Sequence, residues 1–323
     1  MLKTAAPHLL LLANLSFTPY KHSMHQTKSI GYGYALLATF IWSGNFIIAR
    51  GLGETVPPIT LATLRWLTAS LVVLPFAIHI LRRDHRIIRA NLKRLTISAL
   101  LGVTVFNTLI YTAAHTTDAL NLTLIATTTP VFIVILSRLF LGETISRSRA
   151  IGLLCAIVGI ITLVTRGHPS VLLTMDFHVG DLWMLGACLC WAAYSIHIKG
   201  RPQEIGQFTY LAMTILIGVL PLIPAAMVEH SFYPAWTITP TTLGAILYIG
   251  IGASLGAFYL WSRAIATIGP PTASIVYYSL PIFSGVEAYL ILGESVTWAH
   301  VVGFAFILCG ILVATHPRFS LNH

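Results

Sequence analysis

The sequence predicts an all-α membrane protein with ten transmembrane helices, arranged as two inverted repeats of five helices each. The first observation behind this prediction is composition. Hydrophobic residues make up 56% of the 323 residues and charged residues only 9%, whereas a soluble domain carries about 25% charged residues. Because so little polar surface cannot cover a soluble globule of this size, the chain belongs in a lipid bilayer.

The second observation is the length of the apolar stretches. They are continuous and about 20 residues long, which is the length an α-helix needs to cross the hydrocarbon core. A membrane β-barrel would instead alternate apolar and polar residues over about ten positions. The predicted spans cover residues 31–49, 59–80, 95–115, 119–141, 150–165, 180–198, 207–228, 241–262, 271–292 and 299–315.

The third observation is an internal repeat. Pro130 is followed after ten residues by Leu-Gly-Glu, and Pro281 by a second Leu-Gly-Glu at a constant offset of 151 positions. After each Glu a Gly follows nine positions later and another Gly seven positions after that, at Gly152 and Gly159 and again at Gly303 and Gly310. The repeat indicates an internal duplication. The predicted parts are an N-terminal segment (1–30), a first repeat (31–165), an outer connecting loop (166–179), a second repeat (180–316) and a tail (317–323).

An odd number of spans per repeat means that the second repeat enters the membrane from the opposite side, so the repeats are inverted. If the N-terminus is cytoplasmic, sixteen of the nineteen Lys and Arg residues fall on the cytoplasmic side, two (Arg50 and Arg166) on the outer side, and Arg65 within a span. This asymmetry predicts a multi-pass protein of the cell inner membrane with both termini in the cytoplasm. It also accounts for the net charge of +9 without a nucleic-acid partner.

Two further features bear on the N-terminal end of the chain and on metal binding. The apolar run from His8 to Phe17 is too short to cross a membrane, so we expect residues 1–30 to be a disordered cytoplasmic segment, with translation from Met24 as an alternative. All four cysteines lie inside apolar spans without zinc-site spacing. We therefore expect no metal, no other cofactor and no disulfide.

Helix interruptions are the first candidates for a functional site. Pro130 and Pro281 fall near the middle of the fourth and ninth spans, and matched interruptions in the two halves of a carrier point to its substrate site. Tyr277 and Tyr278 lead into the second interruption and are candidate substrate-binding residues. The alternative is that both prolines only shape packing and that the neighbouring hydroxyls repair the helix.

Deep polar and aromatic residues are the second group of candidates. Trp42 and Trp191 occupy equivalent positions near the centres of the first and sixth spans, and Asn45 and Tyr194 follow each of them by three residues. Tryptophans at span ends form interfacial belts, but these two lie too deep for that. We expect all four to line a substrate cavity, and plain core packing is the alternative.

Two charged residues lie within spans. Arg65 is near the start of the second span and Glu287 near the end of the ninth, and ionisable residues in membrane helices tend to be functional. A carboxyl group in a low-dielectric site favours its protonated form, so Glu287 is the candidate for proton coupling and Arg65 for substrate binding. Both lie within about 10 Å of the outer end and could instead extend to the interface.

One motif suggests an enzyme. Residues 252–256 read Gly-Ala-Ser-Leu-Gly, which fits the nucleophile pattern of serine hydrolases and would make Ser254 the nucleophile of an intramembrane hydrolase. That motif requires a turn between a strand and a helix, whereas this copy lies inside a span. Small residues four apart also allow close helix packing, and we favour that interpretation.

The pattern resembles the EamA type of the drug/metabolite transporter superfamily over residues 31–316. The resemblance depends on Trp-Ser-Gly-Asn-Phe at 42–46, Leu-Arg-Trp at 64–66, Thr117 to Asn121 and both repeated phrases. It implies ten helices in two inverted repeats around a central cavity and export of amino acids or other small metabolites, often coupled to protons. It also implies a non-enzymatic protein whose partners are a small-molecule substrate, protons and the bilayer, acting as a monomer or homodimer. A flippase for a lipid or lipid-linked group is the closest alternative, and a sideways-open cavity lined by basic residues would favour it.

Overall fold

The computed structural model describes residues 19–52, 56–117, 119–233, 237, 239–293 and 295–315, and all regular secondary structure in these ranges is helical. The first half contains α1 (Pro19–Leu52), α2 (Pro58–Ala90), α3 (Leu92–Ala99), a π-helical segment (Leu100–Val105), α4 (Phe106–Thr116), α5 (Ala119–Ala126), α6 (Thr129–Leu141) and α7 (Arg147–Val164). A 3₁₀ turn (Pro169–Thr174) connects the halves. The second half contains α8 (Val179–Lys199), α9 (Gln207–Val219), α10 (Leu222–Glu229), α11 (Pro240–Leu247), a second π-helical segment (Tyr248–Gly256), α12 (Ala257–Ile268), α13 (Pro270–Tyr277), α14 (Leu280–Leu292) and α15 (Trp298–Thr315).

Eight of the ten predicted spans correspond to helical stretches that are long and apolar enough to cross a membrane. These stretches are α2, α3 to α4, α5 to α6, α7, α8, α9 to α10, α11 to α12 and α15. The predicted first and ninth spans coincide with α1 and with α13 to α14, and as membrane spans they stay predictions. The chain is therefore a multi-pass helical membrane protein.

The predicted N-terminal segment stays a prediction. The first helix, α1, begins at Pro19, within that segment. Residues 1–18 and the predicted tail at 317–323 lie outside the described residues, as do Asp118 and Glu294.

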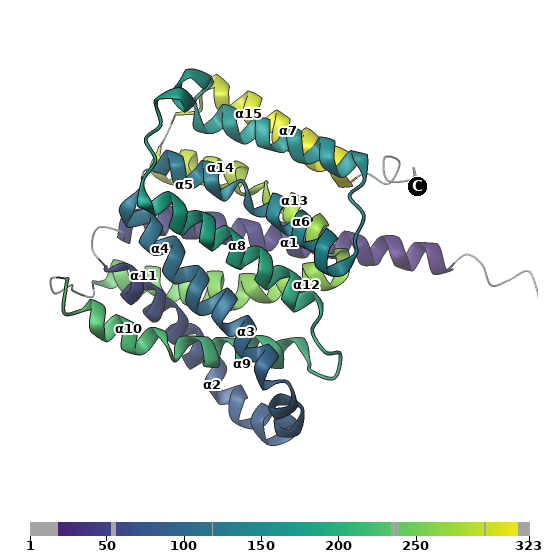
Figure 1. The fold of residues 1–323 in the computed structure, drawn as a ribbon, viewed down its shortest axis with the longest axis vertical. Helices are drawn as coiled ribbons and strands as arrows, with labels where there is room; N and C mark the ends of the chain where they lie inside the picture. Colours follow the sequence, from purple (N-terminus) through teal and green to yellow (C-terminus); the bar gives the residue numbers. More distant parts are fainter. Residues whose placement is uncertain are drawn as a thin grey trace, which may run out of the picture.

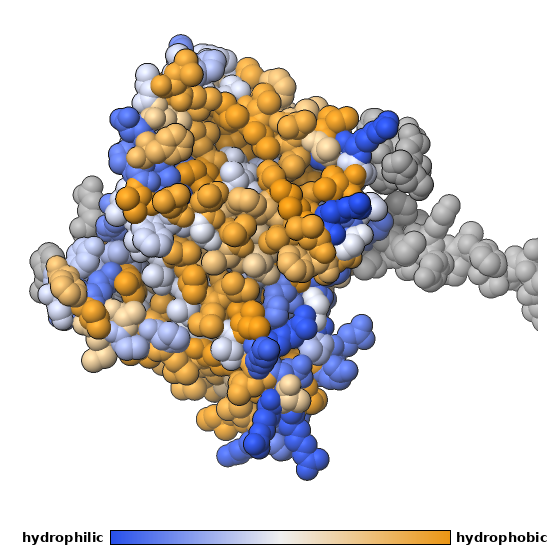
Figure 2. Space-filling view, viewed as in Figure 1, coloured by the Kyte–Doolittle hydropathy of each residue, from blue (hydrophilic) through white to orange (hydrophobic). Residues whose placement is uncertain are grey.

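The helices lie side by side with their axes roughly aligned (Figure 1). The α7 and α15 pair forms one edge of the bundle, α2 and α9 lie at the opposite edge, and α1, α8 and α12 run between them. Apolar residues cover the middle of the visible face, and hydrophilic residues gather at the two ends of the helices (Figure 2). This distribution suits a bundle whose middle faces lipid and whose ends face water.

The repeated phrase ends two helices in the same way. Gly142 follows α6 with a φ of +66°, and Gly293 follows α14 with a φ of +67°. A left-handed residue after the last turn terminates a helix, and glycine adopts that conformation without steric cost. The glycine in each Leu-Gly-Glu is therefore a helix terminator.

The glycines that follow each phrase bring α7 and α15 into backbone contact. A Cβ atom on Gly152 would clash with the carbonyl oxygen of Gly310, and one on Gly159 would lie 2.6 Å from the carbonyl oxygen of Gly303. The partner of each glycine moves backward along α15 as its position moves forward along α7, so the helices are antiparallel. Small residues permit this approach in the same way as in other membrane helix pairs.

Two pairs of irregular segments interrupt the helices near the bundle centre. The fourth span is broken at Thr127 and Thr128, and the ninth span is broken at Tyr278 and Ser279, 151 positions later. The third and eighth spans contain the two π-helical segments, whose last residues, Val105 and Gly256, are also 151 positions apart. Such irregular turns leave backbone groups for other partners, and π-helical turns are frequent at functional sites.

Candidate functional site

Aromatic side chains from four helices meet at the centre of the bundle. Trp42 on α1 makes edge contacts with Trp191 on α8 and Tyr277 on α13, at ring-centroid distances of 5.3 and 5.9 Å. It also contacts Trp261 on α12 at 5.5 Å. Trp191 contacts Tyr194 one turn further along α8 at 5.3 Å. We call these five residues the aromatic cluster.

The aromatic cluster continues into the surrounding core. The ring centroid of Phe106 lies 4.8 Å from that of Trp191, and the ring centroid of Phe258 lies 5.0 Å from that of Trp66. Trp42 and Trp191 are 6% and 4% exposed, so the centre is packed with rings in this conformation. The structure thus brings together four predicted site residues, Trp42, Trp191, Tyr194 and Tyr277, in a compact cluster instead of around an open cavity.

A backbone carbonyl in the second π-helical segment connects the aromatic cluster to Arg65. The indole nitrogen of Trp42 donates to the Ala253 carbonyl at 2.9 Å, and the Nη2 of Arg65 donates to the same oxygen at 3.2 Å. This oxygen accepts both side chains because it lies in the π-helical stretch, where the regular helical pattern of backbone hydrogen bonds is interrupted.

The guanidinium of Arg65 is buried among neutral groups. The residue is 4% exposed. Its Nε donates to the hydroxyl of Ser254, and its Nη1 donates to the hydroxyl of Tyr111 at 3.3 Å. The group also lies 5.3 Å from the ring of Trp66. A buried charge is normally paired with an opposite charge, and the protein partners of Arg65 described here supply only dipoles and a ring.

Glu287 lies on α14 beside α1. The hydroxyl of Ser43 donates to its Oε1 at 2.9 Å. Its Oε2 is buried and has no hydrogen-bond partner among the described residues. Ser43 is the residue after Trp42, so α1 carries both a member of the aromatic cluster and the hydrogen-bond partner of this carboxyl group.

The remaining candidates lie nearby but have other surroundings. Asn45 is half-buried on α1, and its side-chain oxygen has no hydrogen-bond partner in the described part of the chain. Tyr278 faces away from the aromatic cluster and packs with Ile160 and Ile307. Its hydroxyl donates to the Thr127 carbonyl at 2.8 Å. Tyr278 therefore connects the two helix interruptions and satisfies a carbonyl that the break leaves free.

The prolines begin the helices that follow the interruptions. Pro130 is the second residue of α6 and Pro281 the second residue of α14, positions at which a missing N–H leaves no helical hydrogen bond unmade. The hydroxyls of Thr127 and Thr128 donate back to the carbonyls of Leu124 and Ile125, each at 2.6 Å. At the first interruption, the alternative that hydroxyls repair the helix therefore fits the geometry.

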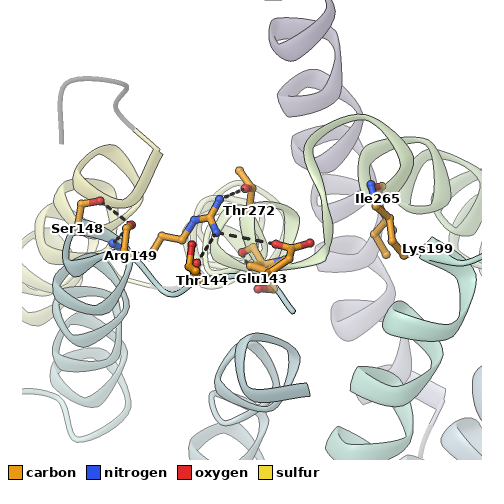
Figure 3. Close-up of polar contacts among 10 residues, drawn as sticks. Glu143, Thr144, Ser148, Arg149, Lys199, Ile265 and Thr272 are labelled. Carbon is orange, nitrogen blue, oxygen red and sulfur yellow. Dashed lines mark hydrogen bonds and ion pairs between the residues drawn. The ribbon is translucent and has the colours of Figure 1, made fainter. Parts of the chain in front are cut away.

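Polar contacts join different helices at the end of the bundle predicted to face the cytoplasm (Figure 3). Arg149, in the first turns of α7, lies 3.9 Å from the carboxylate of Glu143 and donates to the hydroxyl of Thr272 on α13 at 3.4 Å. Lys199 at the end of α8 donates to the Ile265 carbonyl of α12 at 3.3 Å. The first set of contacts joins the two halves of the chain.

A different polar group lies at the opposite end. Asp181, in the first turn of α8, accepts hydrogen bonds from Thr117 at 2.5 Å and from the side-chain amide of Asn121 at 2.9 Å. Its second oxygen also accepts from the backbone N–H of His178 at 2.9 Å. Thr117 and Asn121 are the first and last residues of a stretch on which the family resemblance partly depends. Their hydrogen bonds to Asp181 fix this stretch to the start of α8.

Two cavities lie away from the aromatic cluster. One of about 270 Å³ lies between α14 and α15, where Tyr289, His300 and Phe304 line it. The other, of about 490 Å³, lies between α2, α9 and α12, and Arg83 and Arg263 are among its lining residues. No predicted site residue lines either cavity.

Sequence reasoning missed several groups that the structure places at the centre. Trp66 and Trp261 are fully buried there, and Ser43 binds Glu287. The repeat gave no signal for Trp261, because at the offset of 151 positions its counterpart in the first half is Ile110. The Ala253 carbonyl had no signal, since a sequence does not show which backbone groups a π-helical turn leaves free.

Comparison with known proteins gives consistent matches along the chain. A family model described as the EamA-like transporter family matches residues 29–165 and 178–315. A transporter of Archaeoglobus fulgidus is 26% identical over 285 residues, covering 86% of this chain and 95% of the relative. The transporter YetK of Bacillus subtilis is 24% identical over 287 residues, covering 88% of this chain and 87% of YetK. PecM of Dickeya dadantii is 22% identical over 288 residues, covering 87% and 90%.

The fold also matches a solved structure. A crystal structure covers 89% of this chain, while this chain covers 96% of it, with a TM-score of 0.71 and 19% sequence identity. At this level of identity the likeness concerns the fold alone.

Proposed function

Because the chain belongs to the EamA-like transporter family and is a membrane transporter, we propose that it exports amino acids or other small metabolites by alternating access. No family signature assigns catalytic residues here. The proposal therefore depends on the arrangement of the two halves and on the groups at their meeting point.

Inverted repeats are the first part of the proposal. Residues 31–165 and 180–316 form two units of opposite orientation, in which α7 and α15 are equivalent. Equivalent helices related by a two-fold axis pack antiparallel with crossed partners, and Gly152 with Gly310 and Gly159 with Gly303 have this arrangement. The matched interruptions and π-helical segments, 151 positions apart, support the same relation.

The observation that carries the substrate site is Arg65. A guanidinium that is 4% exposed and has neutral partners retains a charge that a substrate can neutralise. It shares the Ala253 carbonyl with Trp42, so a bound solute would contact both the cation and the aromatic cluster. We expect a small solute with an anionic group, whose apolar part lies against Trp42, Trp191, Tyr194 and Tyr277, with Asn45 as a hydrogen-bonding group at the rim. Tyr278 acts at the helix interruptions instead.

Alternating access is the second part. At the end predicted to be cytoplasmic, α6 packs against α13. At the outer end, α14 is the counterpart of α6, and α5 is the counterpart of α13. There α14 packs on α1, whereas α5 packs on α7 and α8. The packing of α6 on α13, together with the Arg149 contacts to Glu143 and Thr272, makes this conformation the one closed toward the cytoplasm. During transport, α6 and α13 would separate, and α5 and α14 would pack against each other.

Proton coupling through Glu287 completes the mechanism. An ionised carboxylate with one unpartnered oxygen is costly in an apolar surrounding. Protonation removes that cost, so the charge of this group can change with the conformation of the carrier. The excess of Lys and Arg at one end supports an inner-membrane location with both termini in the cytoplasm.

Transport by purified protein tests the proposal. In proteoliposomes loaded with a panel of small organic acids, amino acids and nucleosides, we expect export of at least one solute with an anionic group. Arg65→Gln should reduce its transport by about 100-fold, since removing one partner of a buried pair of opposite charges costs about 3 kcal/mol.

Arg138→Gln is the matched control, because Arg138 is exposed near the end of α6 and should transport at the wild-type rate. Equal transport by Arg65→Gln and wild type would exclude Arg65 from the substrate site. Transport of neutral solutes alone would contradict the expected substrate class.

A lipid flippase is the second candidate function. The cavity between α2, α9 and α12 lies on the side of the bundle, and Arg83 and Arg263 are among its lining residues. A sideways-open cavity lined by basic residues is the feature expected of a flippase. A flippase would move a fluorescent lipid between leaflets and would not require Arg65. Its prediction is lipid translocation that survives in Arg65→Gln.

The hydrolase alternative has unfavourable chemistry. The Ser254 hydroxyl donates to the Ile249 carbonyl at 2.8 Å and accepts from Arg65. An arginine stays protonated and cannot take the proton of a nucleophile. Ser254 is accordingly placed to hold Arg65, and we propose no enzymatic activity.

A further inference from the structure

The cavity of about 490 Å³ is formed by both halves of the chain. It lies between the second half of α2, from Pro75 to Arg83, on one side and the beginning of α9 with Tyr259 and Arg263 of α12 on the other. These segments lie toward the ends of their spans that are predicted to face the cytoplasm, and hydrophilic residues gather along the edge of the visible face where α2 ends and α3 begins (Figure 2). The cavity therefore lies at the level of the lipid headgroups.

Its charged lining is positive, and one cation lacks an acidic partner among the contacts described. Arg83 is paired with Asp84 at 2.8 and 2.9 Å. Arg263 is exposed, and its described contact is the ring of Tyr34, 5.4 Å from the guanidinium carbon. Arg263 is thus available for an anion, and Arg83 lies beside the same cavity.

Hydrogen-bond donors lie beside the same cavity. The side-chain nitrogen of Gln207 is buried without a hydrogen-bond partner in the described part of the chain, and Gln207 lines the cavity. Gln207 also begins α9, whose preceding residue, Gly206, provides no side-chain cap. Uncapped N–H groups at a helix start attract oxygen anions, so they add to the effect of Arg263.

The outer part of the cavity is apolar. Phe76 and Phe208 meet edge to face at 6.0 Å, and they are 57% and 37% exposed. Both lie beside the cationic residues and on the lipid-facing surface of the bundle. An occupant that satisfies the whole cavity must therefore combine an anionic head with a hydrocarbon chain.

We propose that this cavity is a binding site for one anionic phospholipid of the cytoplasmic leaflet. The phosphate lies against Arg263, Gln207 and the start of α9, and an acyl chain runs over Phe76 and Phe208. Basic pockets between transmembrane helices on the cytoplasmic side bind acidic lipid headgroups in this manner. Because the site joins α2 of one half to α9 and α12 of the other, the bound lipid also holds the two halves together at this end.

Lipid titration of the purified full chain tests the proposal. In detergent, with native mass spectrometry as the readout, we expect one phosphatidylglycerol to bind more tightly than phosphatidylcholine of the same chain length. Arg263→Gln should weaken phosphatidylglycerol binding about fivefold and Arg83→Gln/Arg263→Gln about 30-fold, since each basic residue near the headgroups contributes about a fivefold change in affinity. Arg263→Lys should retain binding, because the charge is kept.

The matched control is Arg82→Gln/Arg86→Gln, which removes the same charge from exposed positions of α2 outside the cavity. It should bind phosphatidylglycerol like the wild type. Equal losses in the two double variants would overturn the site, because they would show attraction by the basic surface as a whole. Displacement of the lipid by an equal concentration of free glycerol phosphate would also overturn it, since the acyl chain would then contribute nothing. The readout is binding, so it does not depend on which solute the chain transports.

Discussion

Three acidic side chains within or beside the apolar bundle have different surroundings. The carboxylates of Asp181 and Glu229 both lie at helix starts. Asp181 accepts from His178 N at the start of α8, and Glu229 accepts from the backbone N–H groups of Ile59 and Thr60 at 2.9 and 2.6 Å at the start of α2. Negative charge at a helix N-terminus is stabilised by the unpaired N–H groups there. Glu287 instead lies in a helix interior with one oxygen unpartnered.

This difference predicts the outcome of neutralising each carboxylate. Glu287→Gln should make the transport rate independent of pH, because the amide cannot exchange a proton, whereas the wild type should show a pH-dependent rate. The measurement is solute transport in proteoliposomes between about pH 5.5 and 8.5, the range over which a proton-coupled carrier is expected to respond.

Glu229→Gln is the control for loss of a carboxylate. It should lower the free energy of unfolding by about 1 kcal/mol, as for loss of a helix cap, and should leave the pH dependence of transport unchanged. A Glu287→Gln protein with the wild-type pH profile would remove the proton-coupling hypothesis.

At the residue scale, depth and type allowed the sequence to predict part of the site. Trp42 and Trp191 stand too deep for an interfacial belt, and the structure places both in the aromatic cluster. Tyr278 was predicted on the same grounds, but its hydroxyl donates to the Thr127 carbonyl outside the cluster. Its neighbour Tyr277 faces the cluster, and adjacent residues on a helix point in different directions. Which of two consecutive tyrosines faces the centre depends on helix rotation, and a sequence without an amphipathic pattern does not fix that rotation.

At the scale of the helices, the apolar lengths predicted eight spans that the structure also has, and proline predicted both interruptions. The π-helical segments were not predicted. Residues 100–105 and 248–256 contain no proline, and a π-helical turn forms where packing and side chains such as Asn107 compensate for the altered hydrogen bonds. Asn107 donates to the carbonyls of Gly102 and Val103 at 3.1 and 2.9 Å. In the second segment, the Ala253 carbonyl is satisfied by Trp42 and Arg65 from other helices, and such tertiary contacts cannot be read from local sequence.

The α7 and α15 contact gives a prediction for glycine at this scale. Gly152→Ala should lower the free energy of unfolding by about 1–3 kcal/mol, because the added methyl group meets the backbone of α15 and one helix must shift. The measurement is thermal unfolding of the purified protein in detergent.

Gly33→Ala is the matched control. Gly33 lies inside α1 with no atom within 4 Å of an added Cβ, so the substitution should leave the protein as stable or raise its stability by about 0.5–1 kcal/mol. Equal stability of Gly152→Ala and wild type would mean that the glycines do not hold these two helices together.

At the scale of the whole molecule, the proposed symmetry and its departure suggest how the carrier moves. The packing of α8 against α5 and α6 resembles that of α1 against α13 and α14, as two equivalent units would give. The packing of α6 against α13 belongs to one end of the bundle, where Arg149 joins Glu143 and Thr272 (Figure 3). If transport requires these halves to separate, then a bond between them should stop it.

A reversible cross-link tests this requirement. In a background in which Cys155, Cys188, Cys190 and Cys309 are replaced by Ala, Arg149→Cys/Thr272→Cys treated with a short bifunctional thiosulfonate should lose at least about 90% of its transport, because α7 and α13 can no longer separate. Reduction should restore it. The control is Thr144→Cys/Arg149→Cys, which joins two positions of one connecting loop and helix start that already lie in contact through the Thr144 carbonyl at 3.5 Å. That cross-link stays within one half and should leave transport unchanged. Full transport by the cross-linked Arg149→Cys/Thr272→Cys protein would show that α7 and α13 stay together throughout the cycle, and alternating access by separation of the two halves at this end would then be wrong.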